Sequence, residues 1–218
     1  PPVLATALIL NAAASPVMSS PAFARLMGLN AELVVVVLAA TTLLLPLTLA
    51  PVALWLLRQG AAIDPADYAL RTGLYLALPL AAAFLFRRLA GVRRIAARDA
   101  EIQGLIVVVL LVFAVAVMDG VTVRLAGEWR LMLLFLIAAT AHNLGFQLLT
   151  GWVFRPLGRH SAMSLGLAAG YRNMALVVAV TGGVAPDLLL YLAVAQVPIY
   201  VLPFLTRPLI RRLAAQTP

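Results

Sequence analysis

The segment Gly170-Tyr171-Arg172-Asn173 brings a charge and a side-chain amide into a long apolar stretch. Glycine weakens a helix, and hydrocarbon cannot satisfy the polar groups of Arg172 and Asn173, so the segment must face protein or water. Broken helices of this kind expose backbone dipoles to ions and anionic substrates in secondary transporters, and a guanidinium there favours a carboxylate or a sulfonate. We therefore predict a helix break at residues 168–174 that holds a substrate-binding site. The alternative is a structural Arg172 that pairs with an acidic side chain from a missing N-terminal half of the protein, or snorkels to the interface, and only holds helices together.

A second group of polar side chains lies in the apolar stretch of about Leu131–Val153. His142 and Asn143 stand near its centre, and Asn143 shares a helical face with Thr140 and Gln147, because residues three and four apart are neighbours on a helix. We expect His142, Asn143 and Gln147 either to bind substrate or to form the interhelical hydrogen bonds that are common in membrane proteins. The usual pKa of histidine also suits His142 to proton coupling.

Further polar residues are supporting candidates for the same site. Thr6 lies with Asn11 on a short apolar piece over Val3–Ala14. Gln196 lies near the centre of the last apolar stretch, where Pro198 predicts a kink. We expect Thr6 and Gln196 to add polar contacts to the substrate-binding site.

The remaining reactive residues form no recognisable catalytic motif. Ser161 and Ser164 lack a Gly-x-Ser-x-Gly context, no His-Glu-x-x-His sequence occurs, and the chain has no cysteine. Thr41 and Thr42 are expected to hydrogen-bond back to carbonyls of their own helix, as threonines in membrane helices often do. We therefore expect neither an enzyme nor a bound cofactor.

The composition indicates which kind of structure positions these residues. Of the 218 residues, 64% are hydrophobic and 11% are charged, and the mean hydropathy is +1.04. A soluble domain is roughly half apolar and a quarter charged, so the lipid bilayer is the expected environment. The basic residues behind the net charge of +8 sit in short clusters between apolar stretches, without an aromatic and basic surface for nucleic acid. Nucleic acid is therefore not an expected partner.

Apolar stretches long enough to cross a membrane recur along the chain. We predict six complete spans, at about 33–57, 68–86, 102–118, 131–153, 161–182 and 188–206. The piece over 3–14 is too short to span alone, and the serine- and proline-rich residues 15–21 are expected at the membrane interface. The predicted fold is an all-α membrane protein with six complete transmembrane helices and one partial helix.

Because the chain has no lysine, its arginines determine the orientation. Alternating the sides of successive spans gives one face eleven arginines: Arg25, Arg87, Arg88, Arg93, Arg94, Arg98, Arg155, Arg159, Arg207, Arg211 and Arg212. The other face receives four: Arg58, Arg71, Arg124 and Arg130. Basic residues near span ends stay inside, so the first face and the C-terminus are predicted to be cytoplasmic, in what we expect to be a bacterial inner membrane.

These features, in this order, resemble the bile acid:sodium symporter family. The resemblance is carried by Pro1-Pro2, by Thr41-Thr42 with Pro46, by His142-Asn143 before Gly145, and by Gly170-Tyr171-Arg172-Asn173. Members of this family have ten transmembrane helices in two inverted five-helix repeats, and their fourth and ninth helices are unwound where they cross. The resemblance implies the C-terminal part of such a protein, whose N-terminal half is missing. It also implies core-domain helices at 1–57 and 120–218 and a panel-domain pair at 58–119.

Two positions differ from what the resemblance implies for sodium-coupled members. Those members carry a glutamate before the ninth-helix crossing and a glutamine before the asparagine, where this chain has Ala168 and Arg172. The fourth-helix crossing, taken at residues 3–5, likewise lacks the implied hydroxyl and amide ligands. A Na⁺ site near Ala169, Tyr171 and Arg172 would therefore be degenerate. We interpret Arg172 as a permanent positive charge in place of a bound Na⁺.

The expected function is secondary active transport of a small organic anion by alternating access, with the coupling ion, Na⁺ or H⁺, left open. Two alternatives remain at this point. One is a non-transporting receptor or scaffold that has the same fold. The other is an efflux carrier for an oxyanion such as arsenite, although the chain has no cysteine thiolate to bind arsenic.

Overall fold

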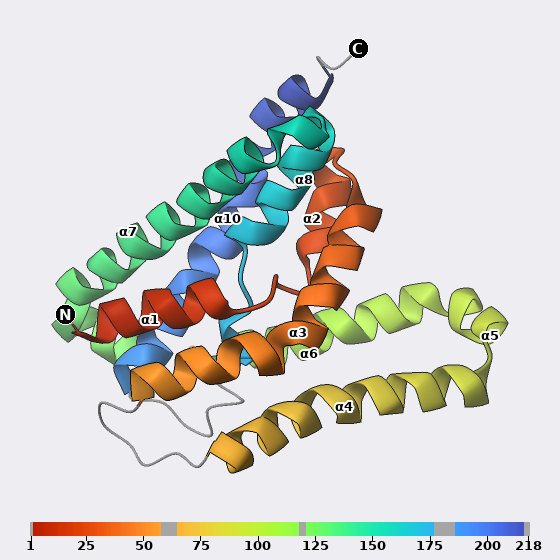
Figure 1. Cartoon of the computed structure of the whole chain (residues 1–218), viewed down its shortest axis with the longest axis horizontal. Coiled ribbons are helices and arrows are strands. Elements are labelled where there is room, and N and C mark those ends of the chain that lie inside the picture. The colour runs from red at the N-terminus through yellow and green to blue at the C-terminus, as the bar shows by residue number, and fades with distance from the viewer. Residues whose placement is uncertain (1, 58–64, 118–120, 177–185, 216–218) are drawn as a thin grey trace.

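The computed structural model describes residues 2–57, 65–117, 121–176 and 186–215. Within these ranges the regular structure is helical, and the β-type pairing consists of one isolated bridge. The helices, shown in Figure 1, are α1 (Pro2–Ala13), α2 (Ser20–Met27), α3 (Ala31–Leu57), α4 (Pro65–Ala90), α5 (Val92–Ala97), α6 (Asp99–Val117), α7 (Val121–Val153), α8 (Arg159–Gly170) and α10 (Pro186–Ala215). A 3₁₀ turn over Arg155–Leu157 separates α7 from α8.

The start of α3 illustrates why these sequences form helices. Residues 34–37 are four consecutive valines, and β-branched side chains lower helix propensity in water. In hydrocarbon, however, the backbone finds no water to bond, so a helix that pairs its own N–H and C=O groups is strongly favoured. A membrane environment would therefore outweigh the local preference of the valines.

Three of the described helices contain an apolar segment long enough to cross a membrane. These segments are Gly73–Ala90 in α4, Gly127–Val153 in α7 and Pro186–Leu213 in α10. The predicted all-α fold is confirmed to this extent, whereas the total of six spans and the inverted repeat stay predictions. α7 begins at Val121 rather than near residue 131, and α10 extends past both ends of the predicted span at 188–206.

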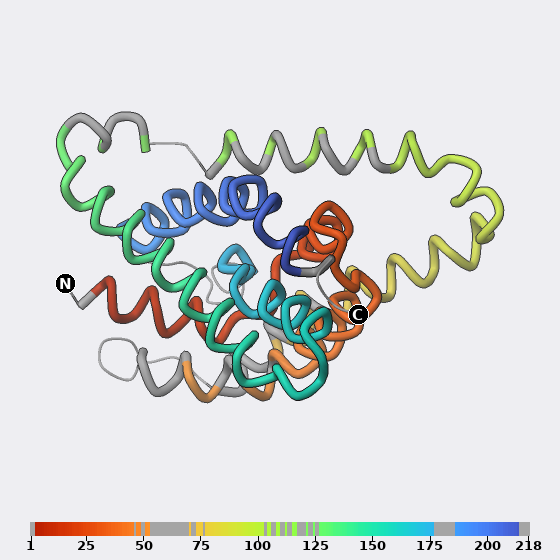
Figure 2. Tube along the Cα trace, turned by 90° about the horizontal axis from the view of Figure 1, so that it is seen from above, coloured from red at the N-terminus to blue at the C-terminus, as the bar shows by residue number. Residues whose placement is uncertain are grey.

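The helices α4, α5 and α6 form an arm at one side of the molecule. Figure 2 shows α4 and α6 running to α5, which lies beyond the other helices. The arm corresponds in sequence to the predicted panel pair at 58–119, of which residues 58–64 and 118–120 lie outside the described residues. The division into panel and core domains stays a prediction.

Two apolar clusters hold the remaining helices together. One contains Leu10, Phe135 and Tyr191, and the rings of Phe135 and Tyr191 meet edge to face at 5.5 Å. The other contains Phe23 of α2 and Leu167 of α8. Helix α10 contributes to both clusters, so it connects the two parts of the bundle.

A charged cluster joins the first turns of α7 and α10. The guanidinium of Arg124 donates to Glu128 at 2.5 Å and to Asp187 at 2.6 Å, and also to the carbonyl of Pro186. Glu128 has non-helical backbone angles (φ −123°, ψ 26°), so α7 is kinked there. The hydrogen bonds to Glu128 and Asp187 raise the pKa of Arg124 above its ordinary value, so this arginine stays charged.

We expect Asp187→Asn to lower the free energy of unfolding by less than about 1 kcal/mol, because the Arg124–Asp187 pair is partly exposed. The loss should shrink at high salt, which screens exposed charges. Thermal unfolding in detergent at low and high ionic strength measures both effects. Glu101→Gln is the control and should change nothing, since Glu101 and Arg98 are 3.8 Å apart and mostly exposed. A large loss that salt does not alter would contradict this prediction.

Candidate functional site

The helix that was predicted to break at residues 168–174 ends where expected. Gly170 is the last residue of α8, and Tyr171 has extended backbone angles (φ −105°, ψ 101°). A helical turn resumes at residues 174–176, and the side-chain oxygen of Asn173 accepts a hydrogen bond from the backbone N–H of Leu176 at 3.2 Å. Asn173 therefore caps the start of this turn. The prediction of a broken helix is confirmed.

The break in this helix pairs with a second break, between α1 and α2. The N–H of Val17 donates to the carbonyl of Tyr171 at 2.8 Å, and the N–H of Asn173 donates to the carbonyl of Ser15 at 2.7 Å. Pro16 and Arg172 lie opposite each other in an isolated antiparallel bridge. Two interrupted helices thus cross at this point (Figure 1).

This crossing corrects two expectations from the sequence. Ser15 and Pro16 are buried at the centre of the crossing, whereas the serine- and proline-rich residues 15–21 were expected at the membrane interface. The crossing was also expected at residues 3–5, which instead belong to the continuous helix α1. The physical reason is that serine and proline end a helix at an interface and in a protein interior alike. Whether Ser15 and Pro16 are buried depends on a distant segment, residues 171–173, which forms backbone hydrogen bonds with Ser15 and Val17.

The side chain of Arg172 connects the two interrupted helices. Its Nε donates to the carbonyl of Ala169 at 2.7 Å, and its Nη1 donates to the carbonyl of Ala14 at 2.8 Å. These carbonyls lie at the C-terminal ends of α8 and α1, where the helix dipole is negative and carbonyls lack a helical donor. The half-buried guanidinium also lies 5.9 Å from the ring centre of Phe146. No acidic side chain among the described residues pairs with Arg172, and the alternative of an acidic partner in the missing N-terminal half stays a prediction.

Two glycines of α8 allow this helix to pack closely against the face of α7 that carries Asn143 and Gln147. A Cβ at Gly170 would lie 2.7 Å from the backbone oxygen of Asn143 and 3.0 Å from Cβ of Gln147. A Cβ at Gly166 would lie 2.5 Å from the backbone oxygen of Gln147. Only glycine allows backbones to approach so closely, as is typical of packed membrane helices. The glycines therefore place Asn143 and Gln147 beside the break.

Three predicted site residues on α7 have buried polar atoms without a hydrogen-bond partner among the described residues. These atoms are Nε2 of His142, Nδ2 of Asn143 and Oε1 of Gln147. The ring of His142 also lies 4.5 Å from the ring of Phe146, the side chain that Arg172 faces. A buried polar atom without a partner costs free energy, so such atoms are suited to bind water or a polar ligand.

The other predicted residues have different surroundings. Thr6 is half-buried on α1, and Gln196 donates to the carbonyl of Leu192 on its own helix at 3.3 Å. Thr41 donates to the carbonyl of Val37 at 2.6 Å, which confirms the expected bond within its helix. The Oγ1 of Thr42 has no partner in the described ranges, so the same expectation is not met there.

Sequence reasoning did not select the serines at the start of α2. The hydroxyl oxygens of Ser15, Ser19 and Ser20 are buried without a hydrogen-bond partner in the described part of the chain. Ser19 is the N-cap residue of α2, and Pro21 occupies the first turn. Serine before proline at a helix start is a standard signal for an N-terminus, so the sequence did contain the information.

A cavity of about 420 Å³ lies among α7, α8 and α10. Gln147 lines it together with Arg155, Arg159 and Thr206, and its other walls are mainly apolar, including Leu148 and Leu209. Gln147 thus borders both the break and a cavity that carries two arginines.

The long apolar helices, among which two interrupted helices cross, point to an integral membrane protein. The sequence model described as the sodium bile acid symporter family matches residues 1–129, more than half of the chain, and the chain belongs to this family. The match includes Thr41 and Pro46 and ends within α7, so the break at 170–173 lies outside it. No curated protein matches the chain. Family members are transporters rather than enzymes, in agreement with the lack of a catalytic motif.

The family name includes sodium, yet two carbonyls at the crossing that could bind Na⁺ are occupied by Arg172, while the buried hydroxyl oxygens of Ser15, Ser19 and Ser20 have no partner among the described residues. Transporters bind Na⁺ with the carbonyls of unwound helices and with half-helix C-termini. Here the carbonyls of Ala14 and Ala169 accept hydrogen bonds from Arg172, whose positive charge would repel a cation.

Proposed function

We propose that this protein is a secondary active transporter of a small organic anion in which Arg172 takes the place of a coupling Na⁺. The observation that carries the proposal is the pair of hydrogen bonds from Arg172 to Ala14 and Ala169. They place a permanent cation at the two half-helix C-termini where a transported Na⁺ would otherwise supply the charge.

The same crossing provides a positive environment for an anion. Helix α2 begins at Ser20 and a helical turn begins after Asn173, so two helix N-termini start near the crossing. Helix N-termini present free N–H groups and the positive end of the dipole. Together with Arg172 they favour a carboxylate or sulfonate, and His142 and Asn143 supply polar atoms beside it.

The transport cycle we propose is alternating access. The core helices at 1–57 and 120–218 rock against the panel pair at 58–119, and the N-terminal half that the family resemblance implies completes the site. The protein lies in a bacterial inner membrane with its C-terminus in the cytoplasm, a proposal that rests on the distribution of arginines.

The test is uptake into proteoliposomes that contain the full-length protein. Labelled bile acids, keto acids and sulfonates are offered in buffers with Na⁺ or with K⁺ in its place. We expect saturable uptake of at least one anion class at the same rate in both buffers. No flux for any anion would indicate a non-transporting protein, whereas uptake that requires Na⁺ would contradict the role given to Arg172.

A further inference from the structure

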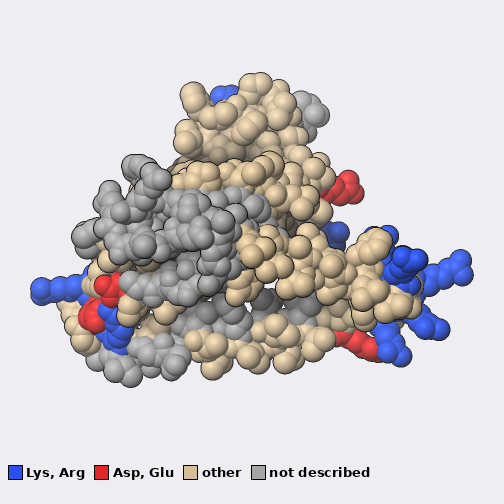
Figure 3. All heavy atoms as spheres, turned by 60° about the horizontal axis from the view of Figure 1, so that its bottom comes forward, with Lys and Arg blue, Asp and Glu red and all other residues tan. Residues whose placement is uncertain are grey.

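The turn between α4 and α6 carries the densest group of positive charges in the chain. Residues 87–101 contain five arginines against two acids: Arg87, Arg88, Arg93, Arg94 and Arg98 against Asp99 and Glu101. All of these side chains are exposed, and the arginines appear as the blue group at the right-hand end of Figure 3. The charge is only slightly compensated, because Arg98 and Glu101 are 3.8 Å apart and more than 70% exposed.

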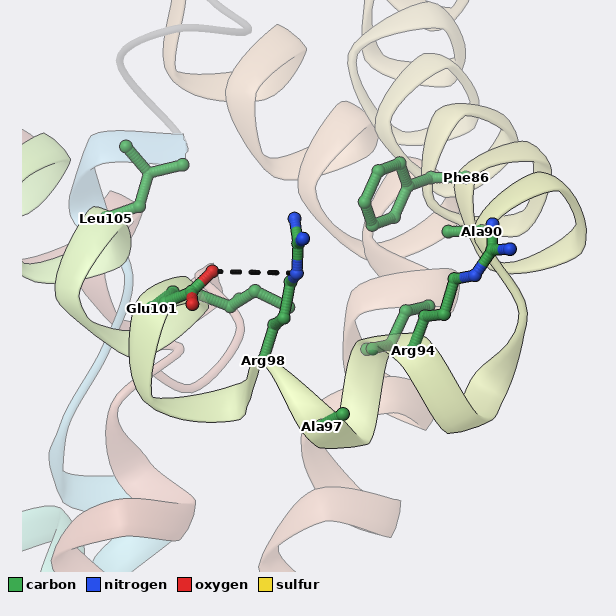
Figure 4. Close-up of a pocket in the computed structure, with 9 residues that line it drawn as sticks. Phe86, Ala90, Arg94, Ala97, Arg98, Glu101 and Leu105 are labelled. Atoms are coloured by element: carbon green, nitrogen blue, oxygen red, sulfur yellow. Dashed lines mark ion pairs between the residues drawn. The ribbon is translucent and has the colours of Figure 1, made fainter.

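A hollow with apolar walls lies directly beneath these arginines. It has a volume of about 640 Å³, and its walls include Phe86 and Ala90 of α4 and Ile102 and Leu105 of α6. Arg94 and Arg98 line the same hollow, together with Glu101, whose carboxylate is 3.8 Å from Arg98. In Figure 4, Phe86 and Leu105 stand on opposite sides of the space, and the side chain of Arg98 rises between them.

The hollow lies at the end of a membrane-crossing helix. The apolar segment Gly73–Ala90 of α4 ends at the hollow, and Leu85 and Leu89 on its last turns are exposed. The arginines therefore stand where the hydrocarbon ends and the lipid headgroups begin. An occupant that combines an apolar chain with a negative group fits both the walls and the rim.

We propose that the hollow between α4 and α6 binds an anionic phospholipid, with its phosphate at Arg94 and Arg98 and an acyl chain along Phe86 and Leu105. A guanidinium binds phosphate oxygens through two parallel N–H groups, which favours arginine at such a site. Clusters of four to eight basic residues next to a transmembrane helix attract anionic lipids by charge alone. The apolar hollow adds a place for the chain, so the site distinguishes a lipid from a soluble anion. This proposal is independent of the transport function proposed for Arg172.

The test is lipid binding to the full-length protein in detergent, measured by native mass spectrometry. Phosphatidylglycerol and phosphatidylcholine are titrated separately, and soluble glycerol phosphate serves as the competitor without a chain. We expect phosphatidylglycerol to bind at least tenfold more tightly than phosphatidylcholine, and glycerol phosphate not to displace it. The double variant R94Q/R98Q should weaken phosphatidylglycerol binding by roughly 30-fold, from the contribution of each arginine near a charged membrane surface.

Three variants separate the hollow from general surface charge. R211Q/R212Q removes two exposed arginines at the end of α10 and should leave binding unchanged. R94K/R98K keeps the charge but lacks the two parallel N–H groups of the guanidinium, so its affinity should lie between those of the wild type and R94Q/R98Q. A90W fills the hollow without altering charge and should weaken binding at least tenfold. Equal losses in R94Q/R98Q and R211Q/R212Q, no preference for phosphatidylglycerol, displacement by glycerol phosphate, or full binding by A90W would each overturn the proposal.

Discussion

Arg172→Gln is expected to lower Na⁺-free anion uptake by about 30-fold. The substitution leaves the carbonyls of Ala14 and Ala169 without their charged donor and removes the permanent cation from the crossing. A hydrogen bond to a charged group contributes about 1.5–3 kcal/mol, and a loss of about 2 kcal/mol corresponds to roughly 30-fold. Initial rates of uptake into proteoliposomes in K⁺ buffer measure the effect.

Arg172→Lys is the control for charge. Lysine keeps the positive charge but lacks the planar fork that reaches two carbonyls, so uptake should lie between the rates of the wild type and Arg172→Gln. Thermal unfolding of each variant shows whether the fold persists. If correctly folded Arg172→Gln transports in K⁺ buffer as fast as the wild type, Arg172 has no role in binding or coupling.

The second large effect is expected from Gly166→Ala, which should lower the free energy of unfolding by about 1–3 kcal/mol. The new Cβ would lie 2.5 Å from the backbone oxygen of Gln147, so α7 and α8 must move apart. Gly170→Ala should act in the same way, because its Cβ would lie 2.7 Å from the backbone oxygen of Asn143. The midpoint of thermal unfolding in detergent measures the loss.

Gly145→Ala is the matched control on the same helix pair. A Cβ at Gly145 has no atom within 4 Å, so the substitution should be neutral or stabilising by up to about 1 kcal/mol through helix propensity. Similar midpoints for Gly145→Ala and Gly166→Ala would show that the close approach of α7 and α8 is not important for stability.

The break after Gly170 could be predicted because its cause is local. An arginine and an asparagine cannot remain unpaired in hydrocarbon, so Arg172 and Asn173 mark a site wherever the rest of the chain lies. The length and apolar character of α7 and α10 were predictable for the same kind of reason, since the bilayer sets the length of a span.

The second half of the crossing could not be predicted, because its cause is not local. Ser15 and Pro16 follow α1, but their burial depends on a distant segment, since the carbonyl of Ser15 accepts its hydrogen bond from the N–H of Asn173. Gly170 was expected to weaken its helix and to belong to the substrate-binding site, but its close approach to Asn143 depends on the packing of α7 and was not predicted. For Gln196 the sequence suggested a contact at the site, but the hydrogen bond that forms is local. The side-chain amide of Gln196 donates to the carbonyl of Leu192 within its own helix.

The arginine that we propose in place of a coupling Na⁺ also gives the proposal its most direct test. The crossing contains two carbonyls that would suit Na⁺, and Arg172 binds both. The measurement is equilibrium binding of radioactive Na⁺ to the purified full-length protein, in the presence and absence of a transported anion. We predict no saturable binding in either condition. Saturable Na⁺ binding by the wild type would contradict the claim that Arg172 replaces the ion.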